Sequence, residues 1–213
     1  MIKKIKVGNA VKEAKIIRGS NRIPQKSVIV EKIINDVIRF GDNAIIKYTK
    51  KYDNVKIDSI LVDKAELRKA YKEVTTNQLN SLKKSKKLLE KNEKMLLERL
   101  TGIILSEDGV RIEKALKPIG SVGCYVPGGR ARYPSTLMMC VVPAIIAGVN
   151  RISVVSPPMK DGKIDPVTLV AADICGIDEI YRVGGAQAVA ALAYGTKTIS
   201  KVDKIVGPGG LFV

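Results

Sequence analysis

The sequence of 213 residues contains no histidine. Histidine is the side chain that most often serves as a general base near neutral pH and as a metal ligand. Its absence excludes serine–histidine and cysteine–histidine nucleophilic catalysis within this chain. It also excludes a histidine-based metal site built wholly from these residues.

Long apolar runs are absent as well. No segment reaches the roughly 18–20 apolar residues that cross a bilayer, and the opening residues lack the apolar core of a signal peptide. Hydrophobic residues nevertheless make up 46% of the chain, which excludes a disordered tail and is enough to bury a core. We therefore expect a soluble, cytoplasmic protein of one or two domains with no membrane contact.

Cysteine is scarce, and its spacing excludes the usual cysteine sites. There are three cysteines, an odd number, and no two of them form a C-x-x-C pair: Cys124, Cys140 and Cys175. Such spacing supports neither a disulfide framework nor a zinc ribbon. We expect these three side chains to be small apolar residues of the core.

Acidic residues are few, so the chain carries a formal net charge of +16. The excess lies in the first half, where residues 1–120 contain 28 lysines and arginines against 15 acidic residues. Aromatic residues make up only 4%, and no nucleic-acid-reading motif is present. We therefore do not expect nucleic acid as a partner, and a basic nucleic-acid-binding protein stays an alternative that charge alone supports.

The first half has helical periodicity. Apolar residues recur at helical spacing between Ser27 and Gly41, and a second helix follows with Asp42 as its cap. A short third helix is predicted over residues 64–73. The longest periodic stretch, over residues 76–100, carries a leucine every seven residues, at Leu82, Leu89 and Leu96. We expect its lysines to form a solvated face, although the leucine stripe equally fits a contact with another subunit.

The second half alternates strands with helices. A hairpin or an edge pair of strands is predicted first, around a polar turn at residues 107–109. Four strands then follow, over residues 122–126, 152–155, 180–183 and 204–206. The helices between them are predicted over residues 136–148, 165–175 and 186–194, with Ser135 capping the first and Pro143 kinking or interrupting it. This alternation predicts a parallel sheet with helices on its faces.

Three of these four strands run into glycine, at Gly128-Gly129, at Gly184-Gly185 and in the GPGG segment of residues 207–210. Because the carboxyl ends of parallel strands meet at one edge, we expect the three loops to cluster there and form a ligand crevice. The pattern does not match G-x-G-x-x-G, so the standard dinucleotide fingerprint is missing. Plain tight turns are the alternative.

Polar side chains lie near these loops. Arg130 and Arg132 flank the first loop, where they pair with an anion or stay solvated. Tyr125 lies at the end of the preceding strand. It is either a core residue or a residue whose ring contacts the base or ribose of a nucleotide. Gln187 lies in the first helical turn after Gly184-Gly185, where free N–H groups suit a phosphate or carboxylate. The residues predict a nucleotide-capable α/β crevice without catalytic machinery.

Three strings resemble the histidinol dehydrogenase family in order and spacing, namely PIGSVGCYVPGGRARYPSTLMMCVVPAIIAGV, VGGAQAVAALAYGT and KVDKIVGPGGLFV. The stretch VEKIINDVIRFGDNAIIKYTKKYD is similar to the helical start of that family. The resemblance covers the chain nearly end to end. It implies a basic, mainly helical region over residues 1–117, followed over residues 118–213 by an incomplete Rossmann-like parallel sheet with helices on both faces.

The resemblance also implies an activity. The family oxidises L-histidinol to L-histidine with two NAD, through an aldehyde, as a zinc-dependent homodimer in histidine biosynthesis. Cofactor contacts are implied for Tyr125, for Gln187 and for Gly210, where the family has an asparagine. The family's zinc ligands and its glutamate–histidine acid/base pair lie beyond the equivalent of Val213, so we expect no catalytic and no metal-ligating residue here.

We therefore expect the amino-terminal half of a histidinol dehydrogenase, which on its own binds NAD weakly at best and is inactive. The alternative is a non-catalytic remnant of that family that acts as a dimerisation or regulatory partner. The leucine stripe and the missing catalytic residues motivate this alternative.

Overall fold

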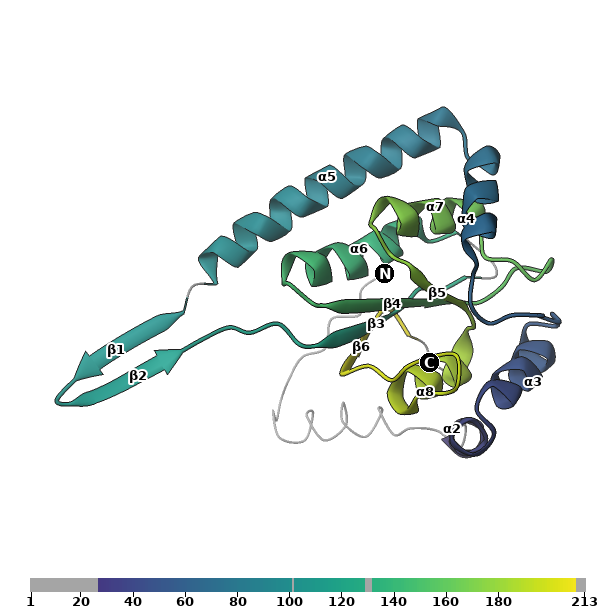
Figure 1. The fold of residues 1–213 in the computed structure, drawn as a ribbon, viewed down its shortest axis with the longest axis horizontal. Coiled ribbons are helices and arrows are strands. Elements are labelled where there is room, and N and C mark those ends of the chain that lie inside the picture. The colour runs from purple at the N-terminus through teal and green to yellow at the C-terminus, as the bar shows by residue number, and fades with distance from the viewer. Residues whose placement is uncertain (1–26, 101, 129–131, 210–213) are drawn as a thin grey trace, which may run out of the picture.

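The computed structural model describes residues 27–100, 102–128 and 132–209. Its first part is helical (Figure 1), and the predicted helices are confirmed to within a few residues. The elements are α2 (Ser27–Phe40), α3 (Asp42–Tyr52), α4 (Lys64–Ala70), the 3-10 turn η1 (Tyr71–Glu73) and α5 (Thr76–Arg99).

Side-chain contacts set where two of these helices begin. The Thr75 hydroxyl accepts a hydrogen bond from the Gln78 N–H at 3.2 Å, and the Gln78 side chain accepts one from the Thr75 N–H at 2.9 Å. This capping box starts α5. The prediction that Asp42 caps α3 is wrong, because Asp42 is the first helical residue and its carboxylate accepts the Thr198 hydroxyl at 2.6 Å instead.

The second part contains a four-stranded parallel sheet in the order β5-β4-β3-β6. Its strands are β3 (Ser121–Tyr125), β4 (Arg151–Ser156), β5 (Glu179–Arg182) and β6 (Lys204–Val206). The connecting helices are α6 (Pro134–Ile146), α7 (Pro166–Ile174) and α8 (Gly185–Tyr194). Successive strands add outward from β3 to β5, and β6 then returns to the other side of β3. The direction of strand addition therefore reverses between β3 and β6.

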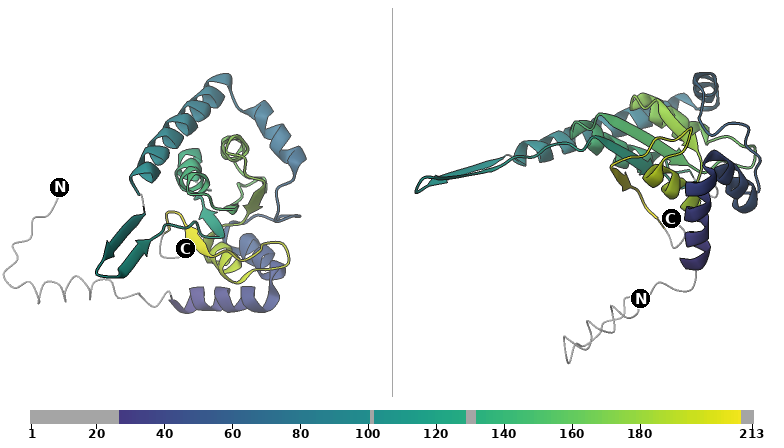
Figure 2. Two further views of the ribbon diagram at one scale, coloured as in Figure 1. Left: turned by 60° about the vertical axis from the view of Figure 1, so that its left-hand side comes forward. Right: turned by 60° about the horizontal axis from the view of Figure 1, so that its bottom comes forward.

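Helices cover both faces of this sheet. α6 and α7 lie on one face with α4 and α5 outside them, and α8 lies on the other face with α2 and α3 (Figures 1 and 2). The first face is packed around residues such as Leu137 and Val154, and the second around Ile45 and Leu192. This is an incomplete Rossmann-like fold behind a helical region. Both cores draw on both regions, and the division at residue 118 stays a prediction.

Two details of α6 differ from expectation. The helix begins at Pro134 with Tyr133 as its N-cap, so Ser135 lies inside the first turn and does not cap it. The helix also continues through Pro143 to Ile146, so the interruption predicted as one alternative is absent, while a kink at Pro143 stays a prediction. A proline removes one backbone donor, and burial of Val142 and Ala144 on either side holds the helix together.

The cysteines behave largely as predicted. Cys124 and Cys175 are buried and Cys140 is half-buried, and all three are free thiols. Burial raises the pKa of Cys124 to about 12 and that of Cys175 to about 11, so both stay protonated and unreactive. Among the described residues, no helix is both long enough and apolar enough to span a bilayer.

An antiparallel hairpin, β1 (Ile103–Glu107) and β2 (Val110–Lys114), projects from the body beyond the end of α5 (Figures 1 and 2). Every residue of both strands is exposed. The leucines of α5 become more exposed toward the hairpin: Leu82 is buried, Leu89 is partly buried and Leu96 is 48% exposed. The far end of α5 and the hairpin therefore lie outside the cores.

Candidate cofactor site at the carboxyl edge of the sheet

The reversal point of the sheet is closed by a glycine. Gly207 follows β6 directly, and a Cβ added there would lie 2.2 Å from the Tyr125 carbonyl oxygen at the end of β3. Only glycine permits this approach of two backbones. In open parallel sheets the crevice outside such a reversal point is where ligands bind.

The other two glycine loops meet at Pro157, which follows β4. A Cβ at Gly184 would lie 2.5 Å from the Pro157 Cβ, and one at Gly128 would lie 3.0 Å from its Cγ. The loops after β3, β4 and β5 are therefore packed against one another. The predicted clustering of glycine loops at the carboxyl edge is confirmed for Gly128, Gly184 and Gly207. Gly129 and Gly210 lie outside the described residues.

Tyr125 connects β3 with the start of α8. Its hydroxyl accepts a hydrogen bond from the Gly185 N–H at 3.2 Å, and the residue is 7% exposed. Burial raises the pKa of Tyr125, the Gly185 N–H opposes that rise, and the charge of Asp53 adds to it. The hydroxyl is therefore neutral at physiological pH and retains a proton to donate.

Gln187 lies in the first turn of α8, beside the same loop. It is only 2% exposed, and its Oε1 would be 2.9 Å from a Cβ at Gly185, where φ is +64°. Among the described residues, no hydrogen bond reaches its amide. Because the first N–H groups of a helix have no partner within it, this turn offers backbone and side-chain donors side by side.

A carboxylate that sequence reasoning missed lies near Tyr125. Asp53 caps the end of α3, where its N–H donates to the Thr49 carbonyl at 2.9 Å. Its Oδ2 and the Thr49 Oγ1 are buried, and neither has a hydrogen-bond partner among the described residues. Burial raises the pKa of Asp53. A buried acceptor without a donor is costly, so this carboxylate is a candidate site residue that the sequence did not indicate.

Of the two arginines near the first glycine loop, the structure describes only Arg132. Arg132 pairs with Asp165, the N-cap of α7, at 3.0 Å while its side chain stays 63% exposed. Only its Nε faces the carboxylate, so a contact of the remaining guanidinium nitrogens with an anionic ligand stays a prediction. Arg130 lies outside the described residues.

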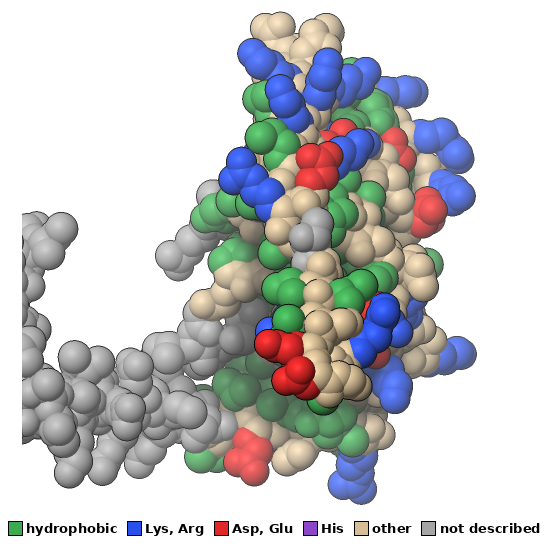
Figure 3. Space-filling view, turned by 90° about the vertical axis from the view of Figure 1, so that its left-hand side faces the viewer, with side chains coloured by type: hydrophobic (Ala, Val, Ile, Leu, Met, Phe, Trp, Pro, Cys, Tyr) green, Lys and Arg blue, Asp and Glu red, His purple; other side chains and the backbone are tan. Residues whose placement is uncertain are grey.

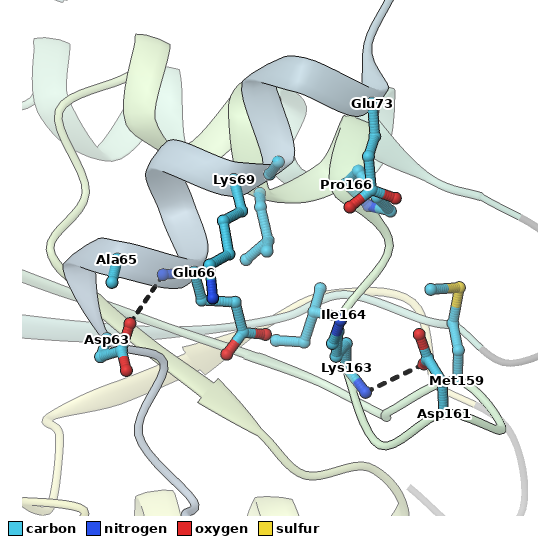
Figure 4. Close-up of a pocket in the computed structure, with 12 residues that line it drawn as sticks. Asp63, Ala65, Glu66, Lys69, Glu73, Met159, Asp161, Lys163, Ile164 and Pro166 are labelled. Carbon is cyan, nitrogen blue, oxygen red and sulfur yellow. Dashed lines mark hydrogen bonds between the residues drawn. The ribbon is translucent and has the colours of Figure 1, made fainter.

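A separate cavity of about 150 Å³ lies between α4 and the loop before α7 (Figure 4). Several of its polar groups form structural contacts: the Asp63 carboxylate accepts the Glu66 N–H, and Glu66 pairs with Arg182 at 2.6 Å. Asp161 likewise accepts the Lys163 N–H at 3.1 Å. None of the predicted site residues lines this cavity. Within the described ranges, no cluster of acidic or cysteine side chains suits a metal ion.

Comparison with protein-family models finds a match described as histidinol dehydrogenase, over residues 17–213. The chain belongs to the histidinol dehydrogenase family. This confirms the resemblance of the sequence strings to that family.

Individual histidinol dehydrogenases show how much of the family this chain represents. That of Clostridium acetobutylicum is 48% identical over 184 residues, which are 86% of this chain and 42% of that protein. That of Methanocaldococcus jannaschii is 43% identical over 214 residues, covering 100% of this chain and 50% of that protein. The chain spans about half the length of the curated relatives it matches.

A solved structure agrees with the fold. The crystal structure of histidinol dehydrogenase from Elizabethkingia anophelis superposes with a TM-score of 0.84 at 34% identity. The match covers 89% of this chain and 43% of that one. The helical region and the incomplete Rossmann-like sheet are thus the fold of part of a histidinol dehydrogenase.

Proposed function

We propose that this chain supplies the NAD-binding, amino-terminal part of a histidinol dehydrogenase that oxidises L-histidinol to L-histidine through the aldehyde. The observation that carries the proposal is the hydrogen bond from the Gly185 N–H to the Tyr125 hydroxyl at the reversal point of the sheet. It brings a neutral donor and a helix amino terminus to one point among the glycine loops at the carboxyl edge of the sheet, the edge at which parallel sheets bind dinucleotides.

The residues present fit NAD, and each has a distinct role in holding it. The first turn of α8 would receive a phosphate through its backbone N–H groups, with the Gln187 amide beside them. The Tyr125 hydroxyl would donate its proton to a cofactor oxygen. The unpartnered Asp53 Oδ2 would accept a ribose hydroxyl. Bound NAD would supply the hydride acceptor. Gly210, the third implied contact, has no amide side chain and lacks that interaction.

Zinc is proposed for the complete enzyme but does not fit the residues of this chain. The sequence has no histidine, and the described residues contain no candidate metal cluster. We therefore assign no catalytic step to the 213 residues and expect them to be inactive alone. L-histidinol as substrate and a homodimer as the assembly are part of this proposal for the complete enzyme.

The proposal is tested by titrating NAD into the purified 213-residue chain and by assaying NADH formation from L-histidinol with zinc present. We expect weak, saturable NAD binding and no turnover. Absence of any NAD binding would contradict the cofactor assignment, and steady NADH production would contradict the assignment of catalysis to residues outside this chain.

A non-catalytic dimerisation or regulatory partner is the second candidate. The exposed apolar end of α5 and the fully exposed hairpin favour a protein contact there. Sedimentation that shows only monomer at tens of micromolar would count against it.

A further inference from the structure

Five lysines on α5 have no part in the proposed cofactor site and form one continuous feature of the surface. They are exposed and lie between residues 83 and 94, namely Lys83, Lys84, Lys87, Lys91 and Lys94. Because successive residues of an α-helix are about 100° apart around its axis, these five side chains lie within an arc of roughly 100°. We call this line of cations along α5 the lysine row.

The lysine row is not neutralised by neighbouring acidic residues. In the part of the chain that the structure describes, the only lysines in ion pairs are Lys47 and Lys86. The two glutamates of the same stretch have other contacts, since Glu90 pairs with Lys86 at 3.4 Å and Glu93 accepts the Asn92 amide at 3.0 Å. Lysines four residues apart on a helix repel each other, so an anionic partner would relieve a repulsion that the fold leaves in place.

The lysine row lies on the side of α5 that faces away from the body. The opposite side packs on α6 and α7 through residues such as Leu82 and Leu89, and no other described element covers the outer side (Figures 1 and 2). In the view toward the hairpin, lysine and arginine side chains gather at the top of the molecule, where α5 runs (Figure 3). Nothing in the described ranges therefore blocks access of a second molecule to the lysine row.

Two exposed apolar side chains border the lysine row. Leu88 is 60% exposed and Met95 is 48% exposed. They are seven residues apart, so they lie on one line along the helix. Leu88 is about one turn away from Lys84 and from Lys91, so a cation lies on each side of it along the axis. Apolar residues seven apart with charges beside them are the pattern through which one helix packs on another.

We propose that the lysine row, together with Leu88 and Met95, binds an acidic amphipathic α-helix of another protein. Lys83, Lys87 and Lys91 are about 6 Å apart along the axis, and glutamates at every fourth position of a second helix have the same spacing. An apolar residue at every seventh position of that helix would contact Leu88 and Met95. Charge and apolar contact are then satisfied by one partner.

A nucleic-acid backbone is a less suitable occupant of the same surface. Its phosphates would match the cations, but phosphate and sugar offer little apolar surface to Leu88 and Met95. Single strands also bind through bases that stack on aromatic side chains, and α5 contains no aromatic residue. The observations therefore favour an acidic helix, and nucleic acid becomes an outcome of the test.

The probe is a labelled synthetic helical peptide of about three heptads, with leucine at every seventh position and glutamate on either side. Fluorescence anisotropy should show saturable binding to the 213-residue chain that weakens as salt is raised. Poly-L-glutamate of the same length, which lacks the leucines, and a DNA duplex of similar length should both bind more weakly. Absence of peptide binding would overturn the proposal. DNA that binds more tightly than the peptide would also overturn it, in favour of a phosphate-binding surface.

Charge reversal locates the contact. Lys87→Glu combined with Lys91→Glu should weaken peptide binding about tenfold or more. The matched control is Lys50→Glu combined with Lys197→Glu, which changes the net charge equally at exposed positions in α3 and in the loop after α8. The control should bind the peptide like the parent. Equal losses in both double variants would show that net charge alone attracts the peptide, and would overturn the proposal.

Leu88→Gln tests the apolar part of the contact. Because Leu88 is exposed and glutamine is a good helix former, α5 should stay folded, which circular dichroism checks. The substitution should weaken binding of the leucine-containing peptide and leave that of poly-L-glutamate unchanged. Undiminished binding of the leucine-containing peptide to Leu88→Gln would overturn the proposed packing of one helix on another.

Discussion

Gly207 lies so close to Tyr125 that a Cβ on the glycine would be 2.2 Å from the tyrosine carbonyl oxygen. We expect Gly207→Ala to force β6 away from β3 and to lower the free energy of unfolding by about 2–4 kcal/mol. Urea denaturation measures this loss. Gly176→Ala is the control, because Gly176 also has positive φ but has open space around it. Equal losses in both variants would mean that backbone strain alone, and not the close approach, matters.

Tyr125→Phe should weaken NAD binding about tenfold, since it removes one hydrogen-bonding hydroxyl and keeps the ring. Gln187→Ala should weaken binding to a similar degree by removing the amide. Isothermal titration calorimetry measures both. Tyr194→Phe, at a tyrosine that is 56% exposed, should bind NAD like the parent. If Tyr125→Phe bound NAD with unchanged affinity, the assignment of the Tyr125 hydroxyl to the cofactor site would be contradicted.

Asp53→Asn should stabilise the unliganded protein above the acidic range. Burial raises the pKa of Asp53 above its usual 3.8, so the folded protein holds its proton more tightly than the unfolded chain does. The free energy of unfolding therefore falls as the pH rises through the interval between the two pKa values, and it stays lower above that interval. Asparagine removes this dependence.

Thermal unfolding between pH 3 and pH 8 tests this prediction at about one-unit steps across the relevant pKa range. The exposed Asp58→Asn variant is the control and should follow the parent curve. The same Asp53→Asn variant should bind NAD more weakly, because an amide is a poorer acceptor for a ribose hydroxyl than a carboxylate. A variant that is less stable than the parent at neutral pH would contradict the assigned burial penalty.

Glu66→Gln should destabilise the junction between α4 and β5. Arg182 and Glu66 approach to 2.6 Å with side chains only 12% and 16% exposed, and loss of the negative charge leaves a largely buried guanidinium without its partner. We expect a loss of about 1–3 kcal/mol by chemical denaturation. Glu73→Gln, in η1, is the control and should change stability by less than about 0.5 kcal/mol. A similar change in both variants would show that the ion pair adds nothing.

The sequence predicts the order of elements well because that order depends on short-range patterns. Thr75 and Gln78, three residues apart in the sequence, form the capping box that begins α5. Strands that run into glycine predict the crowded carboxyl edge, and Gly184 and Gly207 confirm it. The caps predicted at Asp42 and Ser135 were wrong, because α3 and α6 begin after Gly41 and Tyr133 and neither helix has a side-chain cap.

The candidate site was predicted less completely because part of it depends on distant contacts. Tyr125 and Gln187 stand next to glycine loops and so carry a local signal. Asp53 and Pro157 carry none. Folding brings the charge of Asp53 close enough to raise the pKa of Tyr125, and it brings Pro157 against Gly128 and Gly184. Which side chains of the hairpin share a face could be assigned only once the register of its two strands was known.

The hairpin sends no side chain into either hydrophobic core. Replacing residues 102–115 with a flexible linker should therefore leave the rest of the molecule folded, because the remaining packing does not involve them. Packing of the described residues consequently imposes no requirement for isoleucine, leucine or valine at these positions. These side chains therefore point to a contact with something outside the described residues, either another part of the same enzyme or a second molecule.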